Sequence, residues 1–352
     1  MARIITITSG EDGVGKTSFS LNLSLSLASA GFKVCLFDAD SGLSNINIFT
    51  GIHAKKNLES VTFRQSDLKD IIIKDYKGID IIPGGSGIKK ITHLTREQTH
   101  TLVNEFLNLE DYDYFIIDTS CDAAFQALSF CMASHETILV TTCEPASLTC
   151  AYSMLKKLSK YHYRFPVNIL INQAQSGSLA QKAYKQLKEI VNKFLPVKIK
   201  PLGTMASDKN ASAAVIAQTP FFVLFPDTIA SRCIKSITRK LLDKKDQTQN
   251  IPLELFWDKS LYFLKKHRTP EKKPDTQTVY VEKGKEQDPE IKKTLFHIQS
   301  RLSALTKEMN DIKKSLVIHG SPPNKSKEKE TKPPLPNEIS LDFESWLEKK
   351  YK

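Results

Sequence analysis

The sequence lacks any long hydrophobic run. In its 352 residues no apolar stretch reaches the ~18 residues that a membrane-spanning helix needs. No secretory signal precedes the first apolar strand, so we expect a cytoplasmic protein. The six cysteines form no C-x-x-C pair and show no metal-ligand spacing with histidines, which predicts reduced thiols. The chain does have a hydrophobic content of 40%, enough for a sizeable core, and a net charge of +11.

The stretch from Ile4 to Ser18, IITITSGEDGVGKTS, organises the rest of the chain. Its β-branched start predicts a buried strand, and residues 10–17 fit the spacing G-x-x-x-x-G-K-[ST] ahead of a predicted helix. Backbone N–H groups of such a loop and the helix N-terminus surround phosphate oxygens. The residues predicted to bind phosphate are Gly10, Gly13, Val14, Gly15, Lys16, Thr17 and Ser18. Lys16 would reach the β- and γ-phosphates, and the Thr17 hydroxyl would ligate Mg²⁺.

Short apolar strands alternate with helical segments up to about Leu242, which predicts an α/β fold with a mostly parallel sheet and helices on both faces. The predicted strands are 4–8, 33–38, 79–83, 114–118, 137–142, 167–172 and 198–203. The predicted helices are 16–30, 95–109, 146–160, 178–194 and 229–242. Ligands bind such sheets at the carboxyl ends of strands. Asp38, Asp40 and Asp118 stand there, and carboxylates suit a position near Mg²⁺.

We place the end of the nucleotide-binding domain (1–243) where the composition becomes polar. The next part, 244–270, contains an amphipathic helix from Leu253 to Arg268, with apolar residues at helical spacing and several lysines. This pattern is typical of a helix at a membrane interface, and equally of a helix docked on its own domain.

Four smaller parts follow: a linker (271–287), a helix (288–318), a disordered linker (319–338) and a short terminal peptide (339–352). Apolar residues of the helix recur in alternating steps of four and three, which predicts a coiled coil, or alternatively a lone amphipathic helix. In the terminal peptide, Phe343, Trp346 and Leu347 share one helical face, which is typical of a docking peptide.

Five segments carry a resemblance to a known family: SGEDGVGKT, FDADSGLSNINIFTG, IIPGGSG, FIIDTS and EPASLTCAYSMLKKL. They resemble the MinD/ParA superfamily of deviant Walker A ATPases, and the second and third resemble its FlhG (FleN) branch, which governs flagellar number and placement. The likeness covers about residues 2–243. It implies a P-loop NTPase fold, ATP or ADP with Mg²⁺, and a homo-oligomer formed by a nucleotide sandwich or by the coiled coil. It also implies flagellar or polar partner proteins and peripheral attachment to the inner membrane face.

The same resemblance assigns roles to individual residues. Asp38 corresponds to the acid that holds a Mg²⁺-bound water, and Asp118 to the Walker B acid, so both join Thr17 as expected metal-site residues. Asp40 corresponds to the residue that orients the attacking water, which makes Asp40 and Lys16 the expected catalytic pair. Asn172 sits where relatives read the adenine amino group. Pro220 fits a later loop on the adenine side.

Three acidic residues depart from the family pattern. Glu11 stands where relatives have a lysine that reaches the partner's phosphates, and Asp12 and Asp122 stand where relatives have glycine. Losing such a cation removes charge stabilisation worth about 10²–10³ in rate at comparable sites. Three functions stay open: an FlhG-like switch, a catalytically weak nucleotide-binding scaffold that acts through coiled-coil assembly, and a ParA-like partition ATPase that binds DNA. We favour the first, and we interpret the lysines of 178–194 as solvated rather than DNA-binding.

Overall fold

The computed structural model describes residues 2–40, 45–54, 56–63, 65–85, 87–91, 94–109, 112–121, 125–243 and 251–267. The predicted coiled coil (288–318), its flanking linkers (271–287 and 319–338) and the predicted docking peptide (339–352) lie outside these residues. Asp122 lies outside them too. None of the six cysteines forms a disulfide in the structure.

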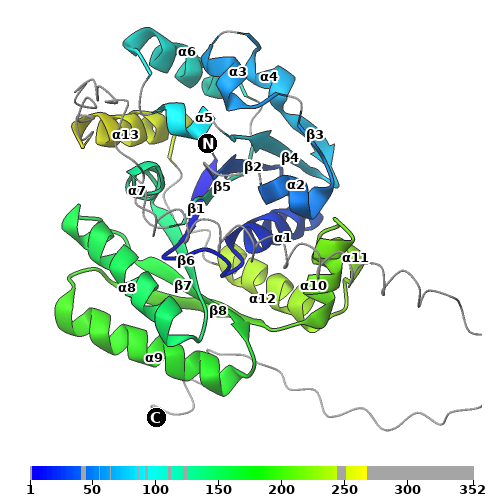
Figure 1. The fold of residues 1–352 in the computed structure, drawn as a ribbon, viewed down its shortest axis with the longest axis vertical. Coiled ribbons are helices and arrows are strands. Elements are labelled where there is room, and N and C mark those ends of the chain that lie inside the picture. Colours follow the sequence, from blue (N-terminus) through cyan, green and yellow to red (C-terminus); the bar gives the residue numbers. More distant parts are fainter. Residues whose placement is uncertain are drawn as a thin grey trace, which may run out of the picture. The chain divides into compact units, whose positions relative to one another are not determined.

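An eight-stranded sheet forms the centre of the described fold (Figure 1). Its strands are β1 (Arg3–Ser9), β2 (Val34–Ala39), β3 (Ile73–Tyr76), β4 (Ile79–Pro83), β5 (Tyr114–Thr119), β6 (Glu136–Thr141), β7 (Val167–Ala174) and β8 (Ile199–Ala206). They lie in the order β3-β4-β2-β5-β1-β6-β7-β8, and neighbours are parallel except for the antiparallel pair β3–β4. This confirms the predicted fold class and all seven predicted strands. The sequence missed β3, because a half-exposed edge strand of four residues carries too little apolar pattern.

Helices cover both faces of the sheet. Successive strand residues point to opposite faces, so the strands contribute apolar side chains to both helical layers. The helices are α1 (Lys16–Ser29), α2 (Asn45–Thr50), α3 (Leu58–Thr62), α4 (Leu68–Ile71), α5 (Gly87–Lys90), α6 (Arg96–Leu107), α7 (Phe125–Ala133), α8 (Pro145–Lys160), α9 (Gly177–Phe194), α10 (Lys209–Ile216), α11 (Phe221–Leu224), α12 (Ile229–Asp243) and α13 (Leu253–Lys266). Ile5 and Ile7 of β1 pack into the layer that contains α1 and α12. Ile4 packs on the other side, with α6, α7 and α13. The five helices that the sequence predicted are all present.

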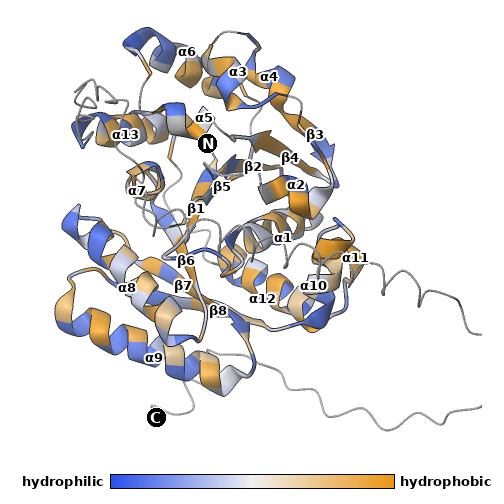
Figure 2. Cartoon of the chain, viewed as in Figure 1, coloured by the Kyte–Doolittle hydropathy of each residue, from blue (hydrophilic) through white to orange (hydrophobic). Residues whose placement is uncertain are grey.

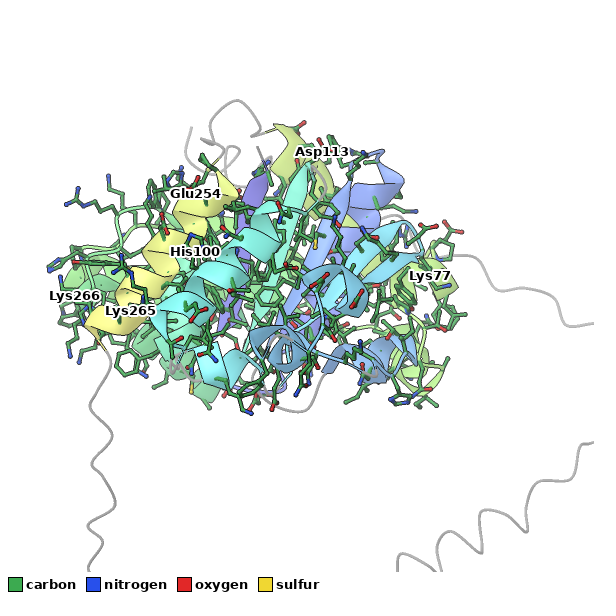
Figure 3. All side chains as sticks on the ribbon, turned by 90° about the horizontal axis from the view of Figure 1, so that it is seen from above. Lys77, His100, Asp113, Glu254, Lys265 and Lys266 are labelled. Atoms are coloured by element: carbon green, nitrogen blue, oxygen red, sulfur yellow. The ribbon has the colours of Figure 1, made fainter. Side chains whose placement is uncertain are left out.

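Helix α13 packs its apolar face into the layer formed with α6 and α7. Figure 3 shows α13, which carries Glu254, beside α6, which carries His100. Trp257 is 0% exposed, and its ring centroid lies 4.3 Å from that of Phe106 and 6.1 Å from that of Phe37. Ser260 Oγ donates a hydrogen bond of 3.0 Å to Ser129 Oγ on α7. This is the docked arrangement, so the face that a membrane would need is buried in the core.

Two consequences concern the parts predicted beyond residue 243. Because α13 shares a core with β2 and β5, the packed unit of the structure continues beyond residue 243. None of the described helices is long and apolar enough to cross a membrane. The solvent side of α13 carries charges of both signs together with Leu255 and Tyr262, which are 42% and 67% exposed, and Lys265 and Lys266 lie at its outer end (Figure 3).

Candidate functional site

The glycine loop joins β1 to α1 in a backbone conformation that depends on its glycines. Gly13 and Gly15 have φ angles of 78° and 87°, a region that residues with a Cβ rarely adopt. A Cβ on Gly10 would lie 2.2 Å from the carbonyl group of Cys150, so the loop rests directly on α8. Lys16 opens α1 and is buried. A glycine loop ahead of a helix N-terminus is the arrangement with which proteins bind phosphate groups.

The carboxylates predicted from the strand ends lie together beside this loop. Asp38 of β2 stands opposite Asp118 of β5 in the parallel register, and both are fully buried. The backbone N–H of Asp40 donates a hydrogen bond of 3.2 Å to Asp38 Oδ1. On Asp118, Oδ1 accepts a hydrogen bond of 2.9 Å from Ser20 Oγ, whereas Oδ2 is buried with no hydrogen-bond partner among the described residues.

Burial is also the main cause of the protonation behaviour of Asp118. It raises the pKa of this carboxyl to about 6, although the Lys16 ammonium and the Thr17 and Ser20 hydroxyls act to lower it. The nearby Asp40 carboxylate raises it further. A cation arriving at this point would therefore find an acid that is readily converted to its charged form near neutral pH.

The residues present fit a magnesium ion held as sequence analysis predicts. A buried acceptor oxygen without a partner, on Asp118, suits a hydrogen bond from metal-bound water. In the part of the chain that the structure describes, no group of three or more His, Cys, Asp or Glu side chains forms a metal cage. Magnesium in nucleotide sites needs none, because waters and phosphates supply most of its ligands. With Thr17 as the protein ligand, the bound ion would neutralise phosphate charge.

The end of β7 holds the loop from the other side. Asn172 Nδ2 donates a hydrogen bond of 2.6 Å to the Val14 carbonyl, and Gln173 Nε2 donates one of 3.0 Å to the Gly13 carbonyl. Gln173 has a φ of 55°, in the left-handed region. The structure thus shows Asn172 as a support of the loop, while its role at adenine stays a prediction.

Pro220 belongs to a segment that is held by a different contact. It precedes α11, and the neighbouring Phe222 N–H donates a hydrogen bond of 2.9 Å to Asn22 Oδ1 on α1. This bond ties the predicted adenine-side loop to the helix that begins at the phosphate loop. Sequence reasoning missed Asn22, Ser20 and Gln173. Ser20 and Asn22 had one available signal, since they are polar residues in an otherwise buried helix.

The two unusual acids of the loop occupy different surroundings. Asp12 Oδ1 lies 3.9 Å from Lys16 Nζ, and the Asp12 side chain is 81% exposed. Glu11 lies beside Cys150, where burial and then the Glu11 carboxylate raise the pKa of the Cys150 thiol. One acid therefore contacts the phosphate-binding lysine, and the other lies where the loop meets α8.

Comparisons with known proteins agree with this geometry. A sequence profile described as an AAA domain matches residues 2–171. The antiactivator FleN of Pseudomonas aeruginosa is 32% identical over 240 residues, which cover 68% of this chain and 86% of FleN. The flagellum site-determining protein YlxH of Helicobacter pylori is 29% identical over 244 residues, covering 69% of this chain and 82% of YlxH.

Solved structures show the same fold. The septum site-determining protein MinD from Pyrococcus horikoshii, in complex with Mg-ADP, superposes with a TM-score of 0.56 at 21% identity, covering 71% of this chain and 100% of that one. A ParA family ATPase from Chlorobium tepidum gives a TM-score of 0.55 at 18% identity, covering 68% and 98%. The chain therefore belongs to the MinD/ParA superfamily of P-loop nucleotide-binding proteins and, within it, to the FlhG-like branch that includes FleN and YlxH.

Proposed function

We propose that this chain is an ATP-binding switch that acts in flagellar number or placement, or in polar positioning, at the inner face of the membrane. The observation that carries the proposal is the buried Asp118, with one oxygen held by Ser20 and the other unpaired, beside the Lys16 loop. Its family relatives FleN and YlxH are named for an antiactivator and for determining the site of flagella. In the proposed site Lys16 would bind the β- and γ-phosphates, Thr17 would hold Mg²⁺, and Asp38 and Asp118 would accept hydrogen bonds from water bound to the metal.

A second candidate, a nucleotide-binding scaffold with weak hydrolysis, has a specific observation in its favour. Asp12 places a carboxylate 3.9 Å from the Lys16 ammonium, so it competes with phosphate oxygens for that cation. Solvent screens part of this competition, since Asp12 is largely exposed. Glu11 adds negative charge where the family resemblance implies a positive one. Nucleotide binding and nucleotide hydrolysis are therefore separate questions for this protein.

One experiment addresses both questions on the same sample. We would measure ADP and ATP affinity by calorimetry, phosphate release by a coupled assay, and the oligomeric state with each nucleotide. Lys16→Ala should lower nucleotide affinity at least ~100-fold, because the loop loses its phosphate-binding cation. Unchanged affinity in that variant would refute the proposed site.

Glu11→Lys then separates the switch from the scaffold. If the protein is a switch, the wild-type protein should hydrolyse ATP, and Lys16→Ala should abolish that hydrolysis. If the protein is a scaffold, the wild-type protein should hydrolyse ATP at a rate near background. Glu11→Lys should then raise that rate about tenfold or more. If Glu11→Lys leaves a low rate unchanged, Glu11 is not the cause of the low rate.

The pH dependence of magnesium-assisted binding tests Asp118 itself. Its folded pKa of about 6 lies above the usual value, so the protonated form predominates below pH 6 and cannot accept a hydrogen bond from metal-bound water at that oxygen. The magnesium-dependent gain in nucleotide affinity should fall by up to about tenfold per pH unit below 6. Nucleotide affinity in EDTA is the control, and a magnesium-dependent gain that is constant from pH 5 to 8 would contradict the assignment.

A further inference from the structure

Helix α9 leaves an apolar stripe uncovered. Leu179, Ile190 and Phe194 are 45%, 47% and 62% exposed, although the adjoining face of α9 is buried on the sheet. At 100° per residue these three side chains fall within about 60° of one another around the helix. Lys182 and Lys193 border the stripe on one side, and Lys193 Nζ lies 5.2 Å from the centroid of the Phe194 ring. We call this set of five residues the α9 stripe.

The surroundings of the α9 stripe carry one sign of charge. Residues 145–200, which form α8, β7, α9 and the start of β8, contain ten basic residues and one acidic residue. The ten are Lys156, Lys157, Lys160, Arg164, Lys182, Lys185, Lys188, Lys193, Lys198 and Lys200, and all are exposed. The acidic residue, Glu189, lies 4.0 Å from Lys185. Helices α8 and α9 lie side by side (Figure 1), and apolar and polar residues alternate along α9 (Figure 2).

A segment of this same chain has the complementary character. Residues 338–348, EISLDFESWLE, contain four acidic residues and no basic one, with Lys349, Lys350 and Lys352 following. Phe343, Trp346 and Leu347 share one side of the segment at helical spacing. An apolar stripe bordered by lysines would be matched by an apolar stripe bordered by carboxylates. We propose that residues 338–348 dock on the α9 stripe of their own chain.

The tether favours this occupant over a free partner. Residues 268–337 separate α13 from the acidic segment, and these 70 residues are long enough to reach across a domain of this size, which is on the order of 45 Å wide. A tethered ligand experiences an effective concentration near millimolar, so weak contacts suffice. The proposal does not rest on nucleotide binding, and its failure would leave the proposed function untouched.

The first test uses the full chain and the position of its two tryptophans. Trp257 is fully buried, so the difference between wild type and Trp346→Phe isolates the emission of Trp346. We expect the Trp346 emission to be blue-shifted and at least threefold less quenched by acrylamide than in a free 338–352 peptide. The double variant Lys182→Glu, Lys193→Glu should raise quenching to the level of the peptide. Lys69→Glu with Lys77→Glu, which changes the same charge on α4 and at the β3–β4 turn, should not.

The second test identifies the occupant. A chain ending at residue 337 keeps the whole described unit, and it should bind the labelled 338–352 peptide at 50 mM salt, at least tenfold more weakly after Lys182→Glu with Lys193→Glu. Concentration-independent protection of Trp346 in the full chain indicates docking in cis. Protection that disappears on dilution overturns docking in the same chain in favour of a second copy. Peptide affinity that is unchanged by Lys182→Glu with Lys193→Glu also overturns the proposal. The proposal is also overturned if the 1–337 chain does not bind the peptide but binds phosphatidylglycerol vesicles or DNA through these lysines.

Discussion

Helices α13 and α9 have similar sequence patterns and opposite surroundings. Both are amphipathic and rich in lysine, and sequence analysis considered each for contact with a charged surface. In α13 the apolar face is buried, with Phe256 and Trp257 at 0% exposure. In α9 a buried face packs on the sheet, and three further apolar side chains stay exposed. The helix for which sequence analysis left membrane contact and docking equally open is part of the core, while the helix interpreted as solvated presents an uncovered apolar stripe.

The difference shows what helical periodicity does and does not specify. Spacing of apolar residues predicts that a helix has a face to bury, but the covering surface comes from distant parts of the chain. For α13 that surface consists of Phe37, Phe106 and Phe130, which belong to three different elements. Substitutions that separate buried from exposed side chains on these two helices test the comparison directly.

The largest expected effect is on folding stability, from Trp257→Ala. Removing a fully buried indole that contacts four aromatic rings should lower the free energy of unfolding by about 3–5 kcal/mol. Tyr262→Ala on the same helix is the matched control, because Tyr262 is 67% exposed, and it should cost less than about 1 kcal/mol. Urea unfolding followed by circular dichroism measures both. Equal effects would mean that α13 is not docked in solution, and the membrane interpretation of its apolar face would return.

A smaller loss of folding stability should distinguish removal of a buried hydroxyl pair from removal of an exposed one. Ser260 Oγ donates to Ser129 Oγ between α13 and α7, in the core. Ser260→Ala should cost about 1 kcal/mol, since Ser129 keeps its own bond to the Gln126 carbonyl and only one buried hydrogen bond is lost. Ser178 pairs with Ser176 at a similar 3.0 Å at the exposed start of α9. Ser178→Ala should be close to neutral, and a cost equal to that of Ser260→Ala would remove this distinction between the two helices.

Helix α13 should also influence the nucleotide site slightly, whereas α9 should not. The Trp257 ring lies 6.1 Å from Phe37, and Phe37 directly precedes Asp38 on β2. Trp257→Phe keeps an aromatic ring but changes that contact, so magnesium-nucleotide affinity should fall about two- to threefold while the fold persists. Phe194→Leu on α9 is the control with unchanged affinity. Calorimetry at pH 8 measures both, and identical affinities for the two variants would disconnect α13 from the site.

Much of the fold and part of the site could be predicted from local sequence. Most of the seven strands were predictable because they are runs of apolar residues buried on both faces, whereas β8 is only partly buried. Asp38 and Asp118 were predictable as neighbours because parallel strands end at one edge. The bond from Ser20 to Asp118 and the supports from Asn172 and Gln173 were not, because they join residues 98 to 160 positions apart. The docking of α13 was undecided for the same reason. Contacts between distant segments, not propensities, decide these features.

The smallest expected effect, Phe194→Ser, decides whether the α9 stripe is truly uncovered. In a chain ending at residue 337 this substitution should change the free energy of unfolding by less than about 0.5 kcal/mol, because Phe194 is 62% exposed. In the full chain the cost should rise to about 1 kcal/mol if residues 338–348 cover the ring. Denaturant unfolding of the four proteins measures the difference between the two costs. Equal costs in both chains would leave α9 with an exposed stripe and no intramolecular occupant, and would make its contrast with α13 complete.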